Sequence, residues 1–150
     1  MELDYELILG VDKQMHFLFY AVISLFIGIV ILLSSDEHSL KKRLSYIWVA
    51  LVLFGVFEEY RQYMVPNRSA EFLDAVANML GVTIGLLFPM FINAIIIKDK
   101  NKFISSHFTI YSIALIPLLI GLLLINERPF VTVDGSFQEE FKNWLLFFGL

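Results

Sequence analysis

Four long stretches of continuous apolar residues dominate the chain, and short polar segments separate them. They cover residues 14–33, 44–60, 75–97 and 108–125. Apolar positions do not alternate with polar ones in these stretches, which favours helices over strands. A spanning helix needs roughly 20 apolar residues, because backbone polar groups find no water in the hydrocarbon core of a bilayer. The pattern therefore predicts an all-α, integral membrane four-helix bundle.

The residues after the fourth stretch follow a different pattern. Ser136, followed three residues later by Glu139, resembles a capping box and predicts the start of a helix. Apolar side chains then recur at helical spacing, at Phe137, Phe141, Trp144, Leu145 and Phe148. The predicted helix, residues 137–148, is too short to span a bilayer. We expect an amphipathic helix lying in the outer interface, with a re-entrant segment as the alternative.

Composition agrees with a membrane protein of one domain. Only 17% of the 150 residues are charged and 58% are hydrophobic, whereas about 25% are charged in typical soluble domains. This length predicts a single domain, residues 1–150. The absence of cysteine excludes disulfides and thiolate metal sites, and the net charge of −4 argues against a nucleic-acid partner. The acidic N-terminus lacks the basic leader of a signal peptide, so we expect the first stretch to be retained.

Basic residues between the stretches predict the orientation of the bundle. Six of the eleven follow the first and third stretches, namely Lys41, Lys42, Arg43, Lys98, Lys100 and Lys102. Short loops rich in Lys and Arg lie on the cytoplasmic side. Both termini and the loop of residues 61–70 are then extracytoplasmic.

Polar side chains lie at the ends of three stretches. Asp12, His16 and Tyr20 are spaced by four and form one helical stripe, with Lys13 close to the same face. Polar groups at membrane depth are costly and usually face a partner or a wet cavity. Each of these residues also has a structural interpretation: Asp12 could cap the first helix, and His16 could be a hydrogen-bonded core histidine.

The second and third stretches carry matching polar positions. Glu59 and Gln62 are three apart, and Asp74 and Asn78 are four apart. Gly81 and Gly85 continue the second of these stripes, a spacing that usually means close helix packing. Ser69 could cap the third helix, with Glu71 favoured by the dipole of its first turn. With the predicted orientation, all these polar ends lie at one depth on the extracytoplasmic side, which predicts a single site.

The order of these residues resembles the VanZ-like family of small bacterial membrane proteins. The segments are DKQMHFLFY at residues 12–20 and EEYRQYMVPNRSAEFLDAVANMLGVTIG at residues 58–85. The residues that match the family pattern are Asp12, Lys13, His16, Phe17, Tyr20, Glu59, Gln62, Arg68, Asp74, Asn78, Gly81 and Gly85. Many members have Asp at position 58 and Gly at position 67, where this chain has Glu58 and Asn67. The match covers roughly residues 8–90.

The resemblance implies a bacterial plasma membrane and a link to glycopeptide resistance, specifically to teicoplanin. It implies no mechanism. An outward-facing polar pocket in a membrane bundle suits this context, because lipid-linked wall precursors are exposed on that side.

The first functional hypothesis is binding of an anionic lipid or lipid-linked cell-wall precursor headgroup. Lys13 and Arg68 would hold its phosphate. The other predicted ligand-binding residues are Tyr20, Glu59, Gln62 and Asn78, with Asp74 also placed to orient the cations.

Two alternatives stay open. In a membrane enzyme acting on such a lipid, His16 would be the base or nucleophile, Asp12 or Asp74 its orienting partner, and Arg68 the charge stabiliser. In a scaffold, the polar residues at the helix ends would only fix how the helices pack against one another. The bundle would then act by binding another membrane protein. One histidine beside carboxylates is a weak metal signal, so we expect neither a metal nor another cofactor.

The orientation is testable because the natural chain has no cysteine. We expect a single cysteine introduced as Ser35→Cys to be cytoplasmic. It should resist a membrane-impermeant thiol reagent on intact cells and react after permeabilisation, as followed by mass spectrometry. Labelling on intact cells would contradict the predicted orientation.

Overall fold

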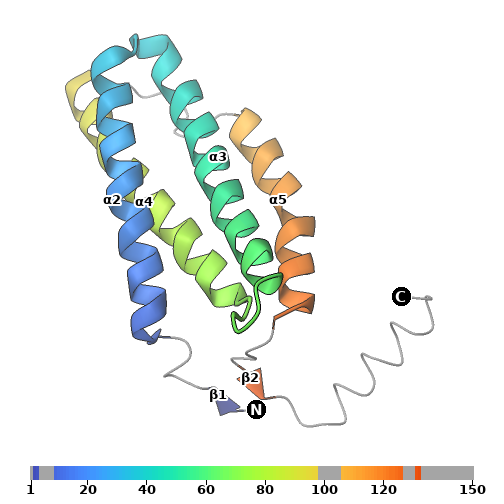
Figure 1. The fold of residues 1–150 in the computed structure, drawn as a ribbon. Helices are drawn as coiled ribbons and strands as arrows, with labels where there is room; N and C mark the ends of the chain where they lie inside the picture. Colours follow the sequence, from blue (N-terminus) through green and yellow to red (C-terminus); the bar gives the residue numbers. More distant parts are fainter. Residues whose placement is uncertain (1, 4–8, 98–105, 127–130, 133–150) are drawn as a thin grey trace.

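The computed structural model describes residues 2–3, 9–97, 106–126 and 131–132. Four helices make up nearly all of this part (Figure 1): α2 Val11–Ser34, α3 Glu37–Tyr63, α4 Phe72–Ile97 and α5 Ser106–Leu124. The short strands β1 Glu2–Leu3 and β2 Val131–Thr132 pair antiparallel, with Glu2 opposite Thr132. The predicted all-α class with four helices is confirmed. The predicted interfacial helix, residues 137–148, lies outside the described residues.

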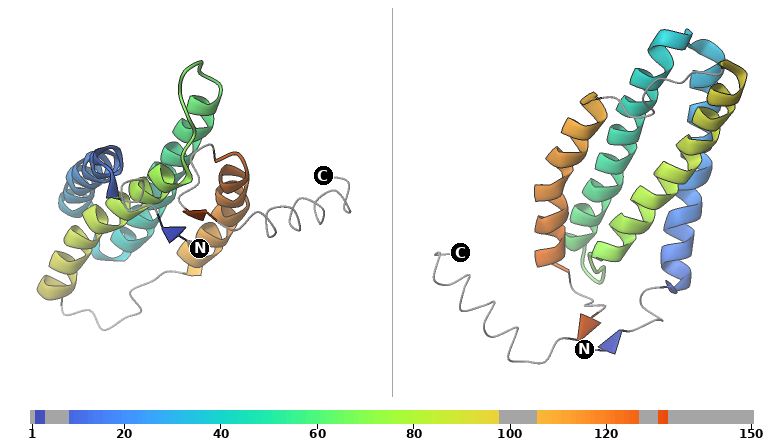
Figure 2. Two further views of the ribbon diagram at one scale, coloured as in Figure 1. Left: turned by 90° about the horizontal axis from the view of Figure 1, so that it is seen from below. Right: turned by 180° about the vertical axis from the view of Figure 1, so that it is seen from behind.

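The four helices run alternately up and down (Figures 1 and 2), so α2 and α4 begin at the end where α3 and α5 finish. The most extensive packing joins α2 to α4, while α3 contacts all three other helices. This arrangement brings the polar beginning of α2, the polar end of α3 and the polar beginning of α4 to one end of the bundle.

The helices extend beyond the apolar stretches that predicted them. The second helix begins at Glu37, about two turns before the predicted residue 44, so Lys41, Lys42 and Arg43 lie inside α3 and not in a loop. Placing them in a loop was wrong, because hydropathy marks only the apolar part of a helix, whereas Lys and Arg are themselves good helix formers. They still lie at the end of the bundle where α2 passes into α3.

Close packing of α2 on α4 depends on small residues. A β-carbon at Gly81 would meet the carbonyl oxygen of Phe17, and one at Gly85 would meet both the Ser24 hydroxyl and the Ala21 carbonyl oxygen. Ser24 is fully buried at this contact, and its hydroxyl lies 3.4 Å from the Gly81 carbonyl oxygen. The spacing of the two glycines therefore serves the packing that the sequence suggested.

Polar bonds join α3 and α5 to the rest of the bundle. Trp48 Nε1 donates to Thr83 Oγ1 at 3.0 Å, linking α3 to α4. The Tyr60 hydroxyl donates to the Leu118 carbonyl at 2.8 Å, linking α3 to α5. After α5, Asn126 Oδ1 accepts the backbone N–H of Phe72 at 2.9 Å. The first N–H groups of a helix have no acceptor within the helix, so this bond stabilises the start of α4.

Much of the apolar surface faces outward. Within the described part of the chain, two helical segments are long and apolar enough to cross a membrane, Val11–Ser34 and Phe72–Ile95. The first segment has a mean hydropathy of 2.7 over its 18-residue apolar stretch, yet only 17% of that stretch is buried within the protein. Large side chains such as Phe19 and Phe26 are more than half exposed. Soluble proteins rarely expose apolar surface on this scale.

Adding a methyl group at the α2–α4 contact should destabilise the bundle. We expect Gly85→Ala to lower the free energy of unfolding by about 1–3 kcal/mol, the usual range for overpacking, because the Ala21 backbone cannot move aside as a side chain would. Unfolding in mixed micelles would measure it. The exposed neighbour substitution Ile84→Ala is the control, and equal stability of both variants would contradict the close approach.

Candidate functional site

The Lys13 ammonium is the centre of a buried ion cluster. Lys13 lies in the first turn of α2, Glu71 directly precedes α4, and Asp74 lies in its first turn. The ammonium pairs with Glu71 Oε2 and lies 2.9 Å from Asp74 Oδ1. All three side chains are less than a tenth exposed. Because unpaired buried charge is strongly unfavourable, this cluster fixes the beginning of α2 against the beginning of α4.

The end of α3 joins the same region through Glu59. Its carboxylate is fully buried, and Oε2 accepts the backbone N–H of Glu71 at 3.3 Å. The Gln62 amide donates to the other oxygen, Oε1, also at 3.3 Å. A carboxylate at the N-terminus of a helix is favoured by the free N–H groups and by the helix dipole. Glu59 therefore positions α4 and does not face open space.

His16 contacts Asn78 on one side and faces two carboxylates on the other. Its Nδ1 lies 3.1 Å from Asn78 Oδ1. With that oxygen as the acceptor, Nδ1 carries the proton and Nε2 presents its lone pair. Nε2 lies 3.8 Å from Asp12 Oδ1 and 3.9 Å from Asp74 Oδ2. Asn78 is only 1% exposed, so this orientation is supplied from inside the bundle.

A cavity of about 450 Å³, which we call the polar cavity, opens beside His16. It is lined by Asp12, Met15, His16, Phe19, Tyr20, Phe54, Glu58, Gln62 and Arg68. Glu58 is engaged with Arg61, whose Nε lies 2.8 Å from Glu58 Oε2. This carboxylate raises the pKa of the exposed Arg61 above its usual value, so Arg61 stays charged.

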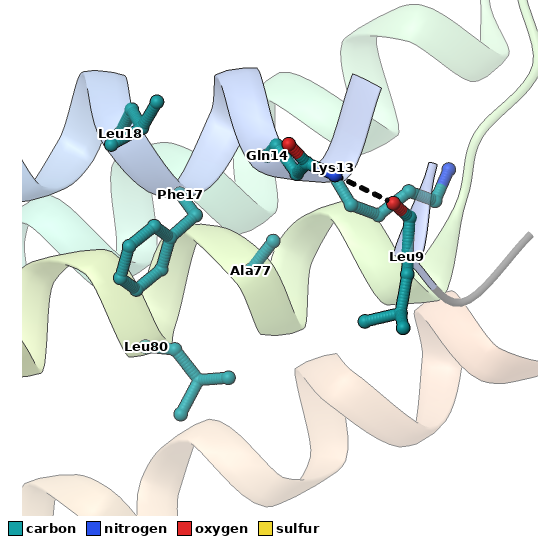
Figure 3. Close-up of a pocket in the computed structure, with 7 residues that line it drawn as sticks. All are labelled: Leu9, Lys13, Gln14, Phe17, Leu18, Ala77 and Leu80. Carbon is teal, nitrogen blue, oxygen red and sulfur yellow. Dashed lines mark hydrogen bonds between the residues drawn. The ribbon is translucent and has the colours of Figure 1, made fainter. Parts of the chain in front are cut away.

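A second cavity, of about 320 Å³, lies between α2 and α4 and is mainly apolar (Figure 3). Leu9, Phe17, Leu18, Ala77 and Leu80 supply its apolar lining. Lys13 and Gln14 line it too, and Gln14 Nε2 donates to the Leu9 carbonyl at 2.9 Å.

The predicted site residues gather at one end of the bundle, but in two layers. The layer that lines the polar cavity consists of Asp12, His16, Tyr20, Gln62 and Arg68. The layer buried behind it consists of Lys13, Glu59, Asp74 and Asn78. Lys13 does not line the polar cavity and its charge is already matched by carboxylates, so among the predicted cations only Arg68 faces that space.

Two capping interpretations were wrong. Gly10 is the N-cap of α2, and Asp12 lies in the first turn. Ser69 does not cap α4; its hydroxyl donates to Glu71 Oε1 at 3.3 Å. Glu71 itself was predicted only as a dipole-favoured residue, yet it is 4% exposed and pairs with Lys13. The signal that could have found it is its position three residues before Asp74, which places both on one helical face.

No protein-family model, curated protein or solved structure matches this chain. The site must therefore be interpreted from its own geometry.

Removing the Lys13 ammonium should take away the cation that two buried carboxylates share. We expect Lys13→Met to cost about 3–5 kcal/mol of stability and the triple variant with Glu71→Gln and Asp74→Asn to recover much of it. Thermal unfolding in detergent would measure both.

The control is Arg61→Met, which removes an exposed cation from the same end of the bundle. This variant should leave the midpoint of thermal unfolding unchanged. A Lys13→Met protein as stable as the natural chain would show that the cluster does not hold α2 against α4.

Proposed function

We propose that this chain is an integral membrane protein whose four helices cross the bilayer, with the polar cavity on the extracytoplasmic side. The exposed apolar surface of α2 and α4 supports this, because lipid would cover what no part of the described protein covers. Residues 44–57 of α3 contain no Asp, Glu, Lys or Arg, and its charges lie at the two ends. Long basic side chains at helix ends reach the interface.

We further propose that the polar cavity binds the phosphate-bearing headgroup of a membrane lipid or a lipid-linked cell-envelope precursor. The observation that carries this proposal is Arg68. Its guanidinium lines the polar cavity, and among the described residues no side-chain hydrogen bond or ion pair holds it, while Glu58 on the same lining attracts it electrostatically. A guanidinium in this state can bind a phosphate bidentately.

The rest of the cavity lining suits such a headgroup. The Tyr20 hydroxyl and the Gln62 amide can bond phosphate oxygens or sugar and glycerol hydroxyls. Met15, Phe19 and Phe54 form an apolar wall on the same cavity. A lipid presents the same combination, with a polar headgroup joined directly to acyl chains.

The resemblance to the VanZ-like family would place this binding in a bacterial plasma membrane and connect it with teicoplanin resistance. One departure from the family pattern supports the comparison. Asn67, where many members have Gly, has a φ of 63°. This left-handed conformation suits Gly best and Asn better than most other residues. The turn that precedes Arg68 therefore keeps the same backbone requirement.

The geometry of His16 favours one second candidate, a membrane enzyme acting on the same lipid. His16 lines the polar cavity, and Asn78 Oδ1 lies 3.1 Å from Nδ1; with the proton on Nδ1, Nε2 would be the base. An oriented imidazole beside an arginine is a suitable arrangement for hydrolysis of a phosphate ester. In that case the natural protein would release a water-soluble product from the lipid, and His16→Ala would not.

Lipid binding can be tested with matched arginine variants. We expect natural protein and Arg61→Ala, purified in detergent, to retain phosphatidylglycerol over phosphatidylcholine in native mass spectrometry. Arg68→Ala should bind phosphatidylglycerol about 10- to 100-fold more weakly, because it loses a charge-assisted hydrogen-bonded pair worth about 1.5–3 kcal/mol.

The three proteins should have the same thermal midpoint, since both arginines are exposed. Equal phosphatidylglycerol binding by Arg68→Ala and Arg61→Ala would contradict headgroup binding in the polar cavity.

A further inference from the structure

Three ligand atoms converge beside the polar cavity. Asp12 and His16, one turn apart on α2, and Asp74 on α4 each offer one nitrogen or oxygen, and these atoms lie within 4.8 Å of one another. The separations from His16 Nε2, 3.8 Å to Asp12 and 3.9 Å to Asp74, are too long for hydrogen bonds. Something smaller than a side chain can therefore lie between them.

These separations fit a metal ion. Bonds of about 2.1 Å place two ligand atoms about 3.0 Å apart at a right angle and about 4.2 Å apart on opposite sides of the ion. Both separations from His16 Nε2 fall between these limits, whereas all three ligand atoms lie within 4.8 Å of one another, so Asp12 has to move slightly closer to complete the site. The Asp12 side chain is 61% exposed, so it can rotate toward an ion without disturbing the core.

The imidazole is already arranged as a ligand. Histidines that bind metals almost always donate the other ring N–H to a carbonyl, a carboxylate or a water molecule. Here Asn78 Oδ1 lies 3.1 Å from Nδ1 and can accept that N–H; in this tautomer the Nε2 lone pair is free to bind a metal ion between the two carboxylates. Asn78 is buried, and it holds this ring orientation independently of Asp12 and Asp74.

The charges around the ligand atoms also favour a cation. Asp12 and Asp74 bring two carboxyl groups to His16 Nε2, and Lys13 lies on the other side of Asp74. Asp74 divides its oxygens: Oδ1 faces Lys13, and Oδ2 faces His16. The nearby Glu58 is already paired with Arg61.

We infer that Asp12, His16 and Asp74 bind one divalent transition-metal ion, such as Zn²⁺ or Mn²⁺, at the wall of the polar cavity. One imidazole and two carboxylates form a mixed donor set suited to these ions. Three protein ligands leave coordination positions for water or for an oxygen of a bound phosphate. This second role, bridging to a phosphate headgroup, rests on the proposed function, whereas the metal site itself does not.

The site changes the expectation drawn from the sequence. One histidine with nearby acidic residues is a weak metal signal when only spacing is known. The tertiary structure adds Asp74 from another helix, the separations between the ligand atoms, and the Asn78 bond that orients the ring.

Co²⁺ is the probe for the first experiment, because its visible absorption reports nitrogen and oxygen ligands. Chelator-treated full-length protein in detergent should bind one Co²⁺ per chain, with new visible bands, and Zn²⁺ should displace it. The variants His16→Ala and Asp12→Asn should each bind at least about tenfold more weakly. Asp12 is exposed, so its variant should fold normally.

The matched control is the double variant His38→Ala/His107→Ala, which removes the other two histidines of the chain and should bind Co²⁺ like the natural protein. Absence of saturable binding, or equal binding by His16→Ala, would overturn the inference.

Phosphatidylglycerol binding measured on the same chelator-treated samples separates the two proposals. Lipid binding that depends on Arg68 without any Co²⁺ site would remove the metal inference alone. A Co²⁺ site without lipid binding would remove the proposed function and leave the metal site standing.

Discussion

Burial of one ammonium group is the constraint on which the rest of the structure depends. Lys13 lies where α2 meets α4, away from water, and needs carboxylates on the facing helix. Glu71 and Asp74 meet that need only when α2 and α4 have one relative rotation and one register. The small residues Gly81 and Gly85 then let the two backbones approach along the same line. Charge compensation sets the register, and packing makes it possible.

The polar cavity follows from this register. With Lys13 turned toward α4, the neighbouring positions Asp12 and His16 on α2 face the space left beside α3, where Gln62 and Arg68 complete the lining. The buried layer supports the layer that lines the cavity: Asn78 contacts His16, and Glu59 accepts the backbone N–H of Glu71 at the start of α4. The residues that line the polar cavity are thus held in place by residues buried behind them.

Electrostatics makes the two proposals compatible. The carboxyl groups outnumber the cations at this end of the bundle, which by itself would repel a phosphate. Arg68 provides one local exception within the polar cavity. A divalent ion on Asp12, His16 and Asp74 would provide a second, next to the first, and would convert an acidic wall into a surface that attracts anions.

The sequence by itself determined the four helices and the end of the bundle where polar groups gather, because apolar length and helical spacing are local properties. It also placed Asp12, His16 and Tyr20 on one face. Only the tertiary structure decided which groups neutralise one another. Helical spacing states which residues share a face, but not which partner that face meets. The pairing of Lys13 with Glu71 and the position of Arg68 in the polar cavity therefore emerged only when α2, α3 and α4 were packed together.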